Sequence, residues 1–308
     1  MPSTVTKLGA YVFCDCHNLV EVRLNEGLQC IEFLAFYNCL ALRSVTIPST
    51  VTELGERAFQ GCEKLANVQI REGLQTIGAG AFGGCTALRS VTIPSTIKRL
   101  GEWAFGDCSN MAEVIFLGGE NFLNRDFPAR RLSSEEGILK QDIIGILASG
   151  YSFTSSPLNG VKVSIAWAVS ERIACLPLEH RLSVEDRIRN LPRLELLPDR
   201  HVLAFFPLVR GYPETEDDSD FGVEEVERFD VRDTNNETAR SLYQALQLIA
   251  FYELKETSIL LELAMWKSRI GGDWARADCR VAIPGPAKSL IMEYCGFAGF
   301  LRPAVDCA

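Results

Sequence analysis

The chain has 308 residues, of which 47% are hydrophobic, and its formal net charge at pH 7 is −9. This length predicts about two domains, and an acidic chain without a basic stripe is a poor candidate for binding nucleic acid. No apolar run approaches the roughly 20 residues that a membrane-spanning helix needs, and residues 1–4 lack the regions of a secretory signal, so the sequence as written predicts a cytoplasmic protein.

Residues 1–117 carry a repeat with a fixed period of 23 residues. Phenylalanine stands three residues before each repeated cysteine, and leucine or methionine three residues after it; the cysteines are Cys16, Cys39, Cys62, Cys85 and Cys108. A fixed period in this range is typical of a solenoid, in which each repeat is one coil stacked on the next. The sequence therefore predicts a solenoid of about five coils, in the α/β class.

Each coil is expected to have two limbs. The first is a short strand such as residues 42–47, in which Val45 and Ile47 alternate with polar residues, as in a half-buried strand. Stacking would place these strands side by side in a parallel sheet, with about 4.8 Å between coils. The second limb, such as residues 54–62, contains glycines and is too short for a full helix, so we expect a turn with about one helical turn.

The repeated cysteines are interpreted as packing residues. Free cysteine is among the most buried residue types and behaves as a small hydrophobe. The chain contains 11 cysteines but no C-x2-C pair, so neither a zinc site nor any other metal site is predicted. Cys14 stands two residues before Cys16 but at a variable position of the repeat, where metal binding is the less favoured interpretation.

The run from Ile47 to Leu65 reads Ile-Pro-x-x-Val-x-x-Leu-Gly-x-x-Ala-Phe-x-x-Cys-x-x-Leu. This pattern resembles the BspA-type leucine-rich repeat, and the resemblance covers residues 1 to about 117. It implies a curved, right-handed leucine-rich repeat solenoid with a parallel sheet along one face, and a role in protein–protein recognition or adhesion. Residues 235–241 and 276–280 resemble the tails of diatom leucine-rich repeat proteins, from which no chemistry can be transferred.

The first coil is expected to expose an apolar edge. Met1 aligns with Ile47 and Ile93, so the sequence begins in the middle of a coil, and terminal repeats normally need a polar cap. Either the stack is truncated or something covers this edge. If the N-terminus is truncated, a cell-surface or secreted location becomes possible.

Residues 118–308 are predicted to form a mainly α-helical domain that caps the solenoid. Capping boxes at Ser133-x-x-Glu136 and Thr234-x-x-Glu237 would open helices ending near Gly150 and Gly271. A shorter helix is expected from Ser183 to a point before Pro192, and a last one after Pro286. Residues 161–175 are apolar up to Pro177, and residues 202–209 fit a helix or a strand equally well.

An acidic loop is predicted at residues 213–233. Between Glu214 and Glu237 eleven acidic residues stand against Arg228 and Arg232, which accounts for the whole net charge. Such a run is usually a solvated or disordered loop. The alternative interpretation is a tether for a basic partner.

No catalytic, cofactor-binding or metal-ligating residues are predicted, and the chain is not expected to be an enzyme. Its three histidines, His17, His180 and His201, lie outside any nucleophile motif, and neither a His-Glu-x-x-His motif nor a phosphate-binding glycine loop is present. The pair Glu253-x-x-Glu256 is interpreted as a solvated helix face rather than an acid/base pair.

Two functions remain open from the sequence. The first is a non-catalytic module that binds a protein partner through the outward side of the strands, formed by Glu21, Arg23, Ser44, Thr46, Asn67, Gln69, Ser90, Thr92, Glu113 and Ile115. These residues could equally serve only to keep the sheet soluble. The second is an enzyme or regulatory protein with its activity in the helical domain, in a pocket lined by His180 or His201, and with the repeats as a targeting arm.

Overall fold

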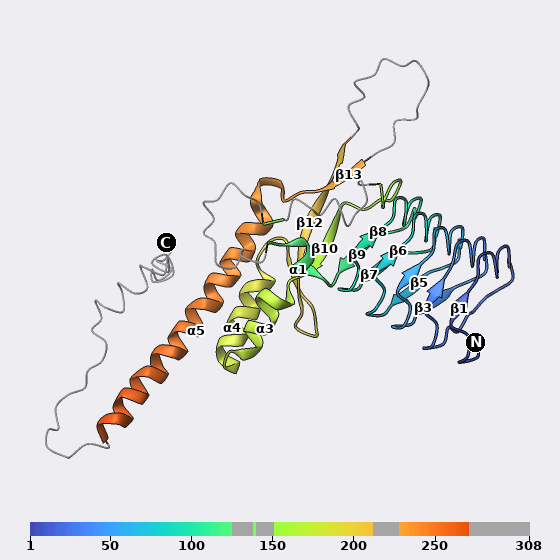
Figure 1. Cartoon of the computed structure of the whole chain (residues 1–308). Coiled ribbons are helices and arrows are strands. Elements are labelled where there is room, and N and C mark those ends of the chain that lie inside the picture. The colour runs from blue at the N-terminus through green and yellow to red at the C-terminus, as the bar shows by residue number, and fades with distance from the viewer. Residues whose placement is uncertain (125–137, 140–150, 212–227, 271–308) are drawn as a thin grey trace.

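The computed structural model describes residues 1–124, 138–139, 151–211 and 228–270 (Figure 1). The repeat region forms a parallel-sheet β-solenoid of about five coils with a step of 23 residues, which confirms the predicted solenoid and the parallel pairing. The first-limb strands are β3 (Ser44–Ile47), β5 (Asn67–Ile70), β7 (Ser90–Ile93) and β9 (Glu113–Phe116). Figure 1 shows the coils stacked in chain order from the N-terminal end.

The second limb contains a strand rather than a helical turn, so that expectation was wrong. These two-residue strands form a second parallel sheet, made of β1 (Lys7–Leu8), β2 (Cys30–Ile31), β4 (Glu53–Leu54), β6 (Thr76–Ile77) and β8 (Arg99–Leu100). Turns follow each strand. Two positions in these turns have left-handed backbone, as at Arg57 (φ 54°) and Gly61 (φ 73°), and the same positions are left-handed in the neighbouring coils. A right-handed helical turn cannot contain such residues.

Stacked phenylalanine rings form the centre of the solenoid. Phe36, Phe59 and Phe82 have no exposed surface, and neighbouring rings lie 4.9 and 5.4 Å apart between centroids, nearly parallel at 5°. The thiols of Cys39, Cys62, Cys85 and Cys108 lie beside this column, and each donates a hydrogen bond to the carbonyl oxygen of the phenylalanine one coil earlier, as from Cys85 Sγ to Phe59 O at 3.3 Å. The packing interpretation of the inner cysteines is thus confirmed, whereas Cys16 in the first coil is only half-buried.

Alkaline pH is expected to destabilise the fold through these thiols. Burial raises the pKa of Cys108 to about 12 and raises the pKa of Cys85 well above its ordinary value. In the unfolded chain both ionise at about pH 8.5, so the free energy of unfolding should fall by about 1 kcal/mol per thiol over the first pH unit above that value, and by about 1.4 kcal/mol per unit further on. Below about pH 8.5 both states hold the protons, and this contribution is fully present.

Urea unfolding between about pH 7.5 and 9.5 measures this effect. The double variant Cys85→Ala/Cys108→Ala, compared with the unmodified chain, isolates the two thiols from other groups that titrate. The unmodified chain should lose about 2 kcal/mol more than the variant over the last pH unit. Equal losses in both proteins would show that these thiols ionise in the folded state.

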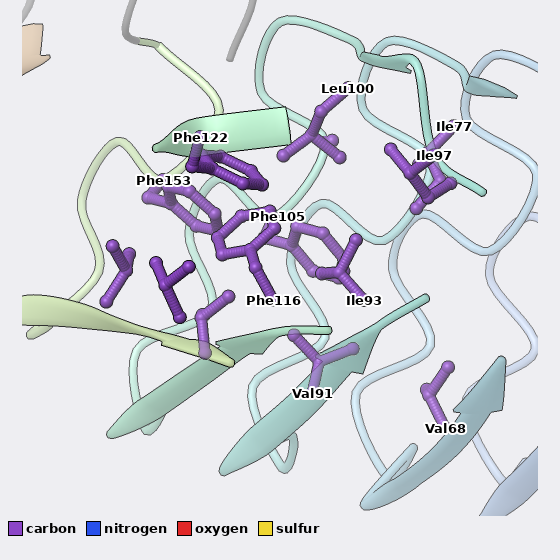
Figure 2. Close-up of a cluster of buried hydrophobic side chains, with 14 of the residues drawn as sticks. Val68, Ile77, Val91, Ile93, Ile97, Leu100, Phe105, Phe116, Phe122 and Phe153 are labelled. Carbon is purple, nitrogen blue, oxygen red and sulfur yellow. The ribbon is translucent and has the colours of Figure 1, made fainter. Parts of the chain in front are cut away.

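The N-terminal edge of the stack exposes apolar side chains, as expected. Tyr11, Val12 and Val20 are exposed by 55%, 47% and 50%. The other end is covered by a sixth, irregular coil formed by residues 151–164. Phe153 stacks on Phe105 with 5.8 Å between ring centroids, and β10 (Gly160–Ser164) pairs in parallel with β9. Figure 2 shows Phe105, Phe116, Phe122 and Phe153 together in the core at this end.

The C-terminal region contains more β-structure than predicted, and a mainly helical domain is not confirmed. β12 (Val202–Gly211) pairs antiparallel with β10, β11 (Leu194–Leu196) and β13 (Arg228–Val231), which extends the sheet of β7 and β9, while β3 and β5 pair separately. Residues 161–175, which suggested one apolar element, divide into β10, a π-helix (Ala166–Ser170) and α3 (Glu171–Cys175). Residues 202–209, whose sequence fits a helix or a strand equally well, lie in the strand β12.

The described residues of this region also form α1 (Gly119–Phe122), α4 (Leu178–Arg189), a 3-10 helix (Thr234–Asn236) and the long α5 (Glu237–Ile270). α4 begins directly after Pro177, not at Ser183. α5 is capped by Asp233 rather than by Thr234, because the Asp233 carboxylate accepts hydrogen bonds from the amides of Thr238 (2.9 Å) and Ala239 (2.8 Å). In the part of the chain that is described, no helix is long and apolar enough to cross a membrane.

Some expectations fall outside the described residues. These are the helix opened by Ser133-x-x-Glu136, the last helix after Pro286, and residues 212–227 of the acidic loop. The end of that loop, residues 228–231, forms β13. The domain division at residues 117 and 118 stays a prediction.

Candidate functional site

The predicted face residues lie in two rows along the solenoid. Val45 and Ile47 in β3 are buried, so the alternating side chains of Ser44 and Thr46 point away from the core. Parallel pairing sets Ser44 beside Asn67 and Thr46 beside Gln69, and it repeats this arrangement between β7 and β9. One row is Glu21, Ser44, Asn67, Ser90 and Glu113, and the other is Arg23, Thr46, Gln69, Thr92 and Ile115.

The centre of this face is an uncharged polar surface, which we call the neutral strip: Ser44, Thr46, Asn67, Gln69, Ser90 and Thr92. Five of these side chains are exposed and Thr46 is half-buried. Thr46 Oγ1 donates a hydrogen bond to Gln69 Oε1 at 3.2 Å, across two coils. A shallow hollow of about 370 Å³ lies over the strip, and all six residues line it together with Val45, Ala66 and Val68.

The charged side chains at both ends of the strip are held in ion pairs. At the N-terminal end, Arg23 Nε lies 2.7 Å from Glu21 Oε1. Arg71 pairs with Glu26, and all four residues line a second hollow of about 230 Å³. At this end the face carries equal numbers of paired acids and bases, so it offers little net charge to a ligand.

At the C-terminal end, Lys162 Nζ lies 2.5 Å from both Glu113 Oε1 and Glu195 Oε2. Burial opposes the charged form of Lys162, but the hydrogen bonds to the two carboxylates outweigh it, and the pKa of Lys162 is raised. Lys162 and Glu195 extend the face beyond the predicted residues. The alternation Val161-Lys162-Val163, which repeats the pattern of the earlier strands, is the signal that could have identified Lys162.

The three histidines and Glu253, which were candidate catalytic residues, each have a defined neighbour in the structure. His17 Nδ1 lies 3.0 Å from Asn38 O, the buried ring of His180 stacks on Tyr252 at 4.4 Å, and exposed His201 lies 3.9 Å from Asp199. Glu253 pairs with Arg172 through both carboxylate oxygens, at 2.9 and 2.6 Å, while the side chain of Glu256 lies outside the described part. Within the described ranges, no three His, Cys, Asp or Glu side chains gather as metal ligands.

Comparison with known proteins identifies the repeats. Residues 1–112 match the family model described as BspA type Leucine rich repeat region, in six copies. No curated protein matches the chain. The description of the matching family names leucine-rich repeats and no catalytic activity.

Two solved structures illustrate the similarity. A leucine-rich repeat protein from Eubacterium ventriosum is 31% identical over 37% of this chain and 31% of its own, with a TM-score of 0.35. A leucine rich cell surface protein from Faecalibacterium prausnitzii is 32% identical over 38% of this chain and 30% of its own, with a TM-score of 0.36. This chain therefore spans less than a third of the length of either structure.

Proposed function

We propose, from the premise that residues 1–112 are a BspA-type leucine-rich repeat region, that this chain is a non-catalytic interaction module. Its partner is a protein that docks on the outward face of the first-limb strands, with the neutral strip at the centre of the contact. Leucine-rich repeat proteins generally act through such contacts, and extended solenoid surfaces are suited to them.

The observation that carries this proposal is the chemical difference between the two sheets. A surface that serves only solubility is rich in mixed charges. The outward side of the second-limb sheet has this character, with Lys7, Glu53 and Arg99 all exposed. The neutral strip has no charged residue in three consecutive coils, yet it is exposed and lies under a hollow. Solubility alone gives no reason for this difference.

Replacing Thr46, Gln69 and Thr92 with lysine is expected to abolish partner capture. The three substitutions place long cationic side chains across the strip, where any bound surface would meet unpaired charge. Because Gln69 and Thr92 are exposed and Thr46 is half-buried, the fold should be retained. The measurement is quantitative affinity capture from cell extract, scored for proteins that the unmodified chain enriches and the variant loses.

The matched control carries the same chemical change elsewhere. Thr6, Thr52 and Gln75 are exposed residues beside or in the second-limb sheet, and their replacement by lysine adds the same charge to another surface. This control should capture the same proteins as the unmodified chain. Retained capture by the strip variant, or equal loss in both variants, would contradict the assignment of the face.

A further inference from the structure

We propose that the neutral strip recognises an uncharged oligosaccharide, so that the part of the partner held at its centre is a neutral glycan. This inference rests on the proposed function, because it names what the same face binds. It is carried by the charge, the hydrogen-bonding groups and the size of the central hollow.

Charge is the first argument. None of the nine residues that line the central hollow is charged. The charged side chains of the two rows are engaged: Arg23 with Glu21, and Glu113 with Lys162. Arg43 and Arg89, which are exposed next to Ser44 and Ser90 in the sequence, are not part of the lining. A charged ligand would leave water for a lining that carries no opposite charge, which is unfavourable. The lining therefore favours an uncharged ligand.

Hydrogen-bonding capacity is the second argument. Each of the six strip residues carries a hydroxyl or a carboxamide, and each of these groups can both donate and accept hydrogen bonds. Sugar hydroxyls have the same double capacity. The paired strands β3 and β5 present their groups on a grid of about 4.8 Å between coils and about 6.7 Å along each strand, and β7 adds Ser90 and Thr92 on the other side of β5. A ligand with hydroxyl groups at close intervals can satisfy such a grid throughout its length.

Size is the third argument. A hollow of about 370 Å³ lies at the lower end of the range of about 300–1,000 Å³ typical of small-ligand sites. Protein hot spots are usually aromatic or arginine side chains inserted into well-packed pockets, and the shallow, polar lining here offers them no apolar pocket. A few sugar units fit the hollow. Because no aromatic ring lines it, binding of a single short chain should be weak.

The test is an NMR titration of the ¹⁵N-labelled full chain with cellotriose, maltotriose and N,N′,N″-triacetylchitotriose as neutral probes. Trigalacturonic acid is the charged comparison. At least one neutral probe should shift the side-chain amide signals of Asn67 and Gln69, and trigalacturonic acid should not. The dissociation constant should stay the same when NaCl is raised from about 0.05 to about 0.5 M, since no charge pairing is involved.

Asn67→Leu should weaken binding of that probe by about tenfold, as expected when a hydrogen-bonding group is removed. Gln75→Leu, at an exposed position beside the second-limb sheet, is the control and should bind as the unmodified chain does. The inference is overturned if none of the three neutral probes shifts the strip signals, if only the acidic trimer does, or if both variants bind equally.

A second arm separates this inference from the proposed function. Captured proteins are treated with glycosidases and offered again to the unmodified chain and to the Thr46/Gln69/Thr92 lysine variant. Loss of capture after the treatment supports glycan recognition. Capture that survives the treatment but still depends on the strip would show a peptide surface as the occupant, which overturns the glycan inference and leaves the interaction module in place.

Discussion

Replacing Phe59 with alanine is expected to lower the free energy of unfolding by about 3–5 kcal/mol. Phe59 lies in the middle coil, has no exposed surface, and stacks on Phe36 at 4.9 Å and on Phe82 at 5.4 Å. Alanine would leave a cavity between two rings whose positions are fixed by the coils on either side, so little relaxation is possible. Urea unfolding followed by circular dichroism measures the loss.

Phe13→Ala is the matched control for this prediction. Phe13 belongs to the same column, with its ring 5.1 Å from Phe36, but it lies in the first coil and is only half-buried. Its loss should therefore cost clearly less than the loss of Phe59. A cost below about 1 kcal/mol for Phe59→Ala, or an equal cost for both substitutions, would contradict a continuous buried column.

Gly78→Ala is expected to destabilise the chain by about 2–3 kcal/mol, through overpacking rather than through a cavity. A Cβ atom at Gly78 would lie 2.6 Å from Glu56 N and 2.7 Å from Gly55 C, both backbone atoms of the preceding coil. Backbone atoms cannot turn aside as a flexible side chain does, so the coils would have to separate. The free energy of unfolding in urea is again the measurement.

Gly9→Ala places the same methyl group at the same repeat position in the first coil. Its Cβ would meet only Glu32 Oε2, at 3.8 Å, which is ordinary contact. We expect a change between zero and a gain of about 1 kcal/mol there, because alanine restricts the unfolded chain more than glycine does. If both substitutions had the same effect, close approach of the coils would not be what requires Gly78.

The 23-residue period of the sequence predicted the parts of the fold that repeat. Because Phe59, Cys62 and Val68 recur every 23 residues, the sequence indicated stacked coils, parallel register and buried thiols. It could not show the sixth coil, because Val163 follows its partner Phe116 by 47 residues, two periods plus one, and Ser156 stands three residues after Phe153, where the earlier coils have cysteine. An inserted stretch hides a repeat from any search at fixed spacing.

Local backbone geometry explains the other differences. The second-limb strands have two residues each, too few for an alternating pattern, and left-handed positions occupied by Tyr11 and Arg57 carry no glycine or asparagine signal. In the C-terminal region, the apolar runs that contain β10 and β12 do not by themselves distinguish a strand from a helix. Pairing with β9 favours the strand at β10, and pairing with β10 favours the strand at β12.

The alternation of buried and exposed residues in each strand predicts the residues of the candidate face, but not the ion pairs at its C-terminal end. Ser44 to Thr92 follow directly from the period-two pattern in each strand. The pairing of Lys162 with Glu113 and Glu195 joins three strands distant in sequence, so only the folded chain reveals that the charged side chains at this end of the face are paired. The role of the face in binding and a cytoplasmic location stay predictions, and a tether at the acidic loop stays the alternative interpretation.

Site-specific photo-cross-linking tests the central claim, that a partner docks on the neutral strip, most directly. A benzophenone amino acid is placed at Gln69 in one chain and at Gln75 in another, two exposed glutamines on different sides of the same coil. After incubation with the captured partner and irradiation, the account predicts a covalent adduct from position 69 and none above background from position 75. An adduct from position 75 alone, or equal adducts from both, would contradict it.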